Sequence, residues 1–132
     1  ILSMALVETG IDIHLAADMA AIRAKSMALT DLFIRLVEER CAGHGFTLAS
    51  PREAAARGSQ VSFAHVEGYP IMRALIAADV IGDFRAPDTV RFGFTPLYVR
   101  FVDVWDAVDR LVAIMDGDIW KQSEYQAREA VT

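Results

Sequence analysis

The sequence predicts an α+β domain: a small, mostly antiparallel sheet with helices packed on one face. Two observations lead to this fold class. Apolar residues recur at helical spacing in several segments, and short alternating segments lie among them. The predicted order is helix, helix, strand, strand, helix, strand, strand, helix. We find no internal repeat and no low-complexity segment.

Composition limits the possible functions. The chain has 132 residues, a net charge of −5, 54% hydrophobic residues and a mean hydropathy of +0.29. This apolar excess favours a surface that faces another domain or subunit. No segment approaches the ~20 apolar residues of a membrane helix, and no basic patch suits nucleic acid or an anionic membrane. Cys41 is the single cysteine, which excludes an internal disulfide and favours a cytosolic protein. The start at Ile1 does not resemble a signal peptide, and we expect a piece of a longer protein.

Two helices are expected in the first third of the chain. The first covers residues 1–17, where Gly10 marks a possible bend. The second follows an Asp18 N-cap and reaches about Cys41. Its apolar stripe is Ile22, Ser26, Leu29, Phe33, Leu36 and Val37, whereas its charged residues, Arg23 among them, are expected to be mostly solvated. His14 is isolated among apolar residues, with no second ligand at helical spacing, so no metal site is predicted.

The middle of the chain changes to a strand period. Residues 46–49 and 60–65 are expected to pair as antiparallel strands, joined by a charged, alanine-rich connection at 52–57. Arg57-Gly58-Ser59 lacks the glycines and the lysine of a phosphate-binding loop. A structural turn is the better interpretation of this block. For His65, a hydrogen-bonded buried histidine is favoured over a catalytic one.

The second half holds the segment that organises the fold. A helix over 68–79 and a short strand over 80–85 precede the turn at Pro87-Asp88. In the next strand, Val90, Phe92 and Phe94 share one face, whereas Arg91 and Gly93 share the other. A helix starting around Asp103, with Asp103 and Asp106 resembling a capping box, is expected to pack on the apolar face. Its stripe is Phe101, Val104, Trp105, Val108, Leu111, Val112 and Met115, and residues 117–132 form a polar tail.

Arg91 is the main candidate for a functional residue. Its planar guanidinium, beside a glycine that leaves space, suits a carboxylate held by two parallel hydrogen bonds. The alternative is a solvated arginine on the outer face of a half-covered sheet. Arg85 is a weaker candidate, because it shares that face only if the two strands pair, and a rim salt bridge is its alternative role. Lys25 and Lys121 lack the desolvated, anion-binding surroundings of a Schiff-base lysine.

The block RFGFTPLYVRFVDVWDAV, together with RGSQVSFAH at 57–65 and the DFRAPD turn, resembles the C-terminal part of kynureninases. These are pyridoxal-phosphate hydrolases of the fold-type-I aminotransferase superfamily. The resemblance covers nearly the whole chain, to about residue 115. It implies that Arg91, in the pattern R-F-G-F-T-P-L-Y, binds the α-carboxylate of the substrate. It further implies a junction helix at 1–17 and a small domain at 18–116.

By the same resemblance, the parent enzyme hydrolyses L-kynurenine, or its 3-hydroxy form, to an anthranilate and L-alanine. Pyridoxal phosphate and its lysine belong to a large domain that this chain lacks, so the chain alone is expected to be inactive. The full-length protein is expected to be a cytoplasmic homodimer. Two alternatives stay open: the small domain of a cysteine-desulfurase-like or epimerase-like enzyme, and a non-catalytic α+β module that binds a ligand or dimerises.

Overall fold

The computed structural model describes the backbone of residues 2–127 and the side chains of residues 6–127. The element order confirms the predicted α+β fold. The helices are α1 (Leu2–Leu15), α2 (Met19–Arg40), α3 (Gly68–Ala77), α4 (Phe101–Asp116) and the short α5 (Ser123–Gln126). The strands are β1 (Thr47–Leu48), β2 (Gln60–Ala64), β3 (Asp83–Arg85) and β4 (Thr89–Gly93).

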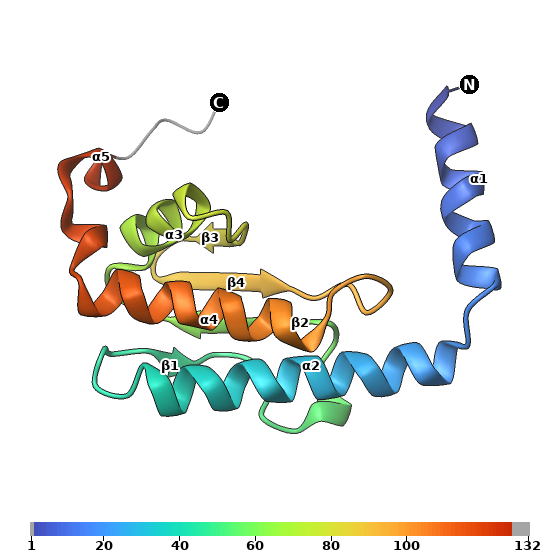
Figure 1. The fold of residues 1–132 in the computed structure, drawn as a ribbon, viewed down its shortest axis with the longest axis horizontal. Helices are drawn as coiled ribbons and strands as arrows, with labels where there is room; N and C mark the ends of the chain where they lie inside the picture. The colour runs from blue at the N-terminus through green and yellow to red at the C-terminus, as the bar shows by residue number, and fades with distance from the viewer. Residues whose placement is uncertain (1, 128–132) are drawn as a thin grey trace.

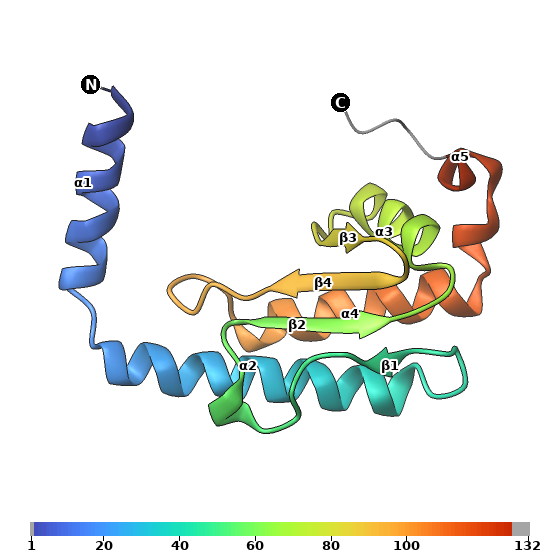
Figure 2. The same ribbon diagram turned by 180° about the vertical axis from the view of Figure 1, so that it is seen from behind.

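The four strands form one antiparallel sheet in the order β1-β2-β4-β3. The two central strands place Val61 opposite Phe92 and Phe63 opposite Val90. All four of these side chains are buried, because α2, α3 and α4 cover this face. Figure 2 shows the sheet from its other side, with α2 and α4 lying behind the strands. The expected one-sided cover of the sheet is therefore confirmed.

Helix α2 supplies much of the core. It begins after Asp18, whose carboxylate accepts a hydrogen bond from the Ala20 N–H at 2.8 Å. The Phe33 ring lies 4.8 Å from the Phe92 ring and 5.2 Å from the Phe94 ring. Aromatic pairs at these separations add to the free energy gained by burial. The helix is thereby fixed against the apolar face of β4.

Helix α4 differs from the prediction at its start and on its outer stripe. It begins at Phe101, two residues before Asp103, because the Asp103 carboxylate accepts a hydrogen bond from the Arg100 N–H at 2.7 Å. The Asp103–Asp106 capping box was therefore misplaced. Phe101 and Trp105 are about half exposed, whereas Val104 and Val108 are buried. The Trp105 ring packs 4.7 Å from the guanidinium carbon of Arg40, which covers part of its apolar surface.

Helix α1 stands apart from the rest of the fold (Figure 1). It runs through Gly10 as one continuous helix. Leu6, Val7, Ile11, Ile13 and Leu15 are each more than half exposed. Apolar residues at this density on a projecting helix favour a covering partner. Among the described residues, no helix combines the length and apolarity needed to cross a membrane.

The connection before β2 is more closely packed than predicted. Residues 54–56 form a 3-10 turn, and Arg57 is only 5% exposed. Arg23 was expected to be solvated; it instead donates hydrogen bonds to the carbonyls of Ala54 and Arg57, both at 2.9 Å.

In the predicted polar tail, residues 119–121 form a 3-10 turn, and both this turn and α5 lie against α3. Residues 128–132 lie outside the described residues.

Candidate functional site

Arg91 lies in the middle of β4 and projects from the sheet face that the helices leave uncovered. Its neighbours along the strand, Val90 and Phe92, are buried on the opposite face, whereas the Arg91 side chain is 30% exposed. The strand register places Ser62 of β2 on one side of Arg91 and Asp83 of β3 on the other. Because directly paired residues share a sheet face, these three side chains form one row.

Asp83 makes an ion pair with Arg91 that sequence analysis did not foresee. The Arg91 Nε donates to Asp83 Oδ2 at 3.1 Å, and Nη2 donates to the same oxygen. The Arg85 Nε lies 3.2 Å from that oxygen as well. The hydrogen bond from Arg91 holds the pKa of the Asp83 carboxyl below its usual value, with Arg85 contributing through its charge. Two arginines therefore meet around one carboxylate on the open face.

Open space lies beside Arg91 on the same face. A Cβ atom added to Gly93 would meet no heavy atom within 4 Å. Gln60 of β2 pairs with Gly93, and its side-chain amide donates to Ser62 Oγ at 3.3 Å. The open face therefore carries a cation, a hydroxyl and an amide beside open space. Groups of this kind suit a small polar ligand that bears a carboxylate.

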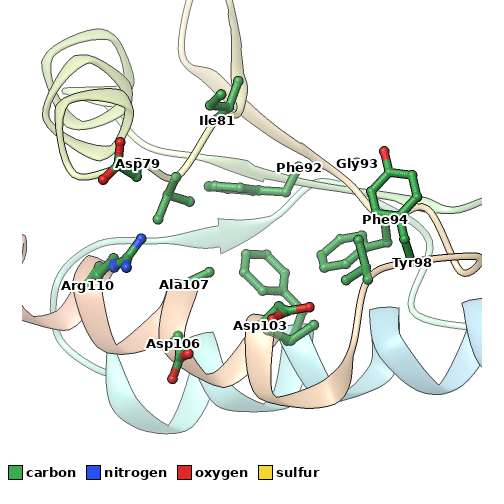
Figure 3. A pocket seen from close by; sticks show the side chains of 14 residues that line it. Asp79, Ile81, Phe92, Gly93, Phe94, Tyr98, Asp103, Asp106, Ala107 and Arg110 are labelled. Carbon is green, nitrogen blue, oxygen red and sulfur yellow. The ribbon is translucent and has the colours of Figure 1, made fainter.

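A pocket of about 550 Å³ lies on the other face of the sheet, between the end of β4, the segment before β3 and the start of α4. Phe92 and Phe94 line its floor, and Asp79, Asp103, Asp106 and Arg110 lie around it (Figure 3). Arg91 does not line this pocket. Gly93 also lines the pocket, so the pocket reaches the strand position two residues after Arg91.

Lys25 and His65 are occupied in local contacts. The Lys25 Nζ donates to the Pro96 carbonyl at 2.6 Å, which ties α2 to the loop after β4. The His65 Nδ1 accepts from the Glu67 N–H at 2.9 Å, so Nε2 carries the proton and donates to the His44 carbonyl at 2.7 Å. The ring is buried against Phe46 at 4.8 Å. His65 therefore has the hydrogen-bonded structural surroundings that were favoured for it.

The candidate site holds no metal-binding geometry. Within the described part of the chain, no group of three or more His, Cys, Asp or Glu side chains is placed to hold a metal ion. Asp83 is the residue that sequence reasoning missed. Asp83 lies across from Arg91 because β3 and β4 are joined by the tight turn at Pro87-Asp88. The position of that turn in the sequence was the signal from which the pairing of Asp83 with Arg91 could have been predicted.

The fold and this row of side chains define the class of protein: an α+β domain with an antiparallel sheet, backed by helices on one face and carrying an ion-paired arginine on the open face. Comparison with known families identifies it further. The family model for the kynureninase C-terminal domain matches residues 22–111, and the chain belongs to this family.

Curated relatives agree with the family model. The chain is 57% identical over all 132 residues to the kynureninase of Pseudomonas fluorescens. It has the same identity, over the same length, to the kynureninases of Burkholderia mallei (strain SAVP1) and Burkholderia pseudomallei (strain K96243). In each case the aligned part is 32% of the relative. The chain thus spans about a third of the length of the curated relatives it matches.

Proposed function

We propose that this chain is the C-terminal domain of a kynureninase, and that Arg91 binds the α-carboxylate of L-kynurenine during its hydrolysis to anthranilate and L-alanine. The observation that carries the proposal is the position of Arg91 on the open face, beside the open space over Gly93. An arginine at this place can hold a planar carboxylate by two hydrogen bonds. Because holding the carboxylate orients the substrate, the contribution is one of alignment as well as affinity.

The residues of this chain do not fit pyridoxal phosphate. A Schiff-base lysine needs a free amine in a desolvated pocket. The Lys25 amine is bound to the Pro96 carbonyl, and the Lys121 amine pairs with Asp118 at 2.8 Å. We therefore assign the cofactor to the remaining two-thirds of a full-length enzyme. That larger part also supplies the surface that covers α1, and we expect the whole enzyme to be a cytoplasmic homodimer.

Arg85 is a weaker candidate than Arg91 for binding the substrate. Its side chain is 65% exposed, and it contacts Asp83, so it lies at the rim of the row. We assign it a supporting electrostatic role. The match to the kynureninase family favours this proposal over a cysteine-desulfurase-like or epimerase-like enzyme. Nothing in the row around Arg91 distinguishes L-kynurenine from 3-hydroxykynurenine.

Steady-state kinetics of the full-length enzyme that carries this domain tests the proposal. A charge-assisted contact contributes on the order of 1.5–3 kcal/mol. At 1.4 kcal/mol for each factor of ten, Arg91→Ala should lower kcat/KM for L-kynurenine about tenfold to several hundredfold. Arg91→Lys should restore only part of this loss, because an ammonium group lacks the coplanar pair of N–H donors that a guanidinium offers to a carboxylate. A near-normal kcat/KM for Arg91→Ala contradicts the proposed role. Glu38→Ala, which removes an exposed ion pair on α2, is the matched control.

A further inference from the structure

We propose that Asp83 is a positioning residue, which holds the Arg91 guanidinium in the one orientation that presents its free edge to the substrate carboxylate. This inference rests on the proposed function, in which Arg91 binds that carboxylate. Asp83 itself does not contact the substrate. It acts through Arg91.

The geometry of the ion pair carries the inference. A guanidinium has two edges that can each present a pair of N–H groups to a carboxylate. Asp83 occupies the edge formed by Nε and Nη2, and both of these atoms donate to its Oδ2. No residue in the described part of the chain accepts a hydrogen bond from Nη1. The edge formed by Nη1 and Nη2 is therefore left for a ligand.

Asp83 is itself held in place by the sheet. It lies directly across from Arg91 in the β3–β4 register. The residue before it, Gly82, packs so closely that an added Cβ would lie 2.8 Å from the Arg91 carbonyl oxygen and 2.6 Å from the Met72 Cε. The Arg85 Nε reaches the same carboxylate oxygen from the other side. Asp83 is thus a fixed anchor for a long side chain that would otherwise sample several rotamers.

Two other roles for the pair make opposite predictions. If Asp83 competes with the substrate for Arg91, its removal should improve substrate binding. If the pair only stabilises the fold, its removal should lower the melting temperature and leave kcat/KM unchanged. Positioning predicts a loss of substrate binding that depends on the substrate's α-carboxylate. Immobilising one flexible side chain on binding corresponds to about a two- to tenfold change in affinity.

The experiment is a double-mutant cycle in the full-length enzyme, with Asp83→Ala, Arg91→Ala and both together. Two ligands are compared: L-kynurenine, and kynuramine, which lacks only the α-carboxylate and is followed as an inhibitor. We expect Asp83→Ala to lower kcat/KM for L-kynurenine two- to tenfold, mainly through KM. The inhibition constant of kynuramine should stay within about twofold. In the Arg91→Ala background, Asp83→Ala should have no further effect.

Asp83→Asn is the control for misfolding of Asp83→Ala, because asparagine keeps the side-chain size and one oxygen acceptor for Arg91. It should lose less of kcat/KM than Asp83→Ala. Three results overturn the inference: a lower KM in Asp83→Ala, an equal change for both ligands, or full additivity with Arg91→Ala. If Arg91→Ala lowers kcat/KM while the Asp83 variants behave like the Glu38→Ala control, only this inference fails. If Arg91→Ala has normal kinetics, the proposed function fails first.

Discussion

The guanidinium of Arg57 donates a hydrogen bond at 3.1 Å to the Thr30 hydroxyl on α2, although the two residues are 27 positions apart. The same side chain donates to the carbonyls of Pro51 and Arg52, at 2.8 and 2.9 Å, and pairs with the carboxylate of Asp31. Ser59, two residues later, shares a 2.6 Å hydrogen bond with Ser26. The Arg57-Gly58-Ser59 block therefore fastens the loop before β2 to α2, which agrees with the structural interpretation.

Arg57→Ala should destabilise the chain substantially. The Arg57 side chain is 2% exposed, and its loss leaves the buried Thr30 hydroxyl and the part-buried carbonyls of Pro51 and Arg52 without this donor. The Asp31 carboxylate left behind is 56% exposed, so the cost comes from the lost charge-assisted hydrogen bonds and is on the order of 1.5–3 kcal/mol. We expect this loss in the free energy of unfolding measured by urea denaturation of the 132-residue chain. Arg52→Ala is the control, since its pair with Glu38 is exposed to solvent and should contribute little to stability. Equal effects of the two substitutions contradict the assigned role of Arg57.

The exposed apolar surface of α1 should cause the 132-residue chain to self-associate. Val7, Ile11, Leu15 and Met19 line a shallow apolar groove that no described residue covers. Ile11→Glu should shift the chain toward monomer in sedimentation experiments without lowering its melting temperature, because Ile11 packs on no core residue. Val66→Glu is the matched control, since Val66 is 86% exposed and lies outside this groove. A chain that is already a monodisperse monomer contradicts the prediction.

Cys41 should resist thiol reagents while the chain is folded. The residue is 3% exposed, and burial raises the pKa of its thiol to about 11. The thiolate is the reactive form, so the native thiol stays protonated and unreactive between pH 7 and 9. In a colorimetric thiol assay, labelling should be slow in buffer and rapid in urea. Rapid stoichiometric labelling of the native chain at pH 7 is the contrary result.

The elements that the sequence predicted well are those with a strong period. The apolar stripe of α2 and the alternation of β4 each specify a buried face, so packing follows from the pattern. Contacts between residues far apart in the sequence could not be predicted in this way. The exposure of Trp105 depends on Arg40, and the orientation of Arg91 depends on Asp83, and neither partner is fixed by local spacing. The burial of Arg57 was missed for the same reason, because two of its four acceptors, the Thr30 hydroxyl and the Asp31 carboxylate, lie on α2.

Gly93 offers a test of the open space beside Arg91 that does not alter any charge. An added Cβ meets no atom within 4 Å, so Gly93→Ala and Gly93→Leu should leave the melting temperature of the 132-residue chain within a few degrees of the original. In the full-length enzyme, Gly93→Leu should fill the space beside Arg91 and raise KM for L-kynurenine, whereas Gly93→Ala should have a smaller effect. A 1 Å displacement of a bound substrate can reduce its turnover about a hundredfold, so kcat should fall as well. Normal kinetics for Gly93→Leu would place the substrate elsewhere, and would remove the space over Gly93 from the proposed site.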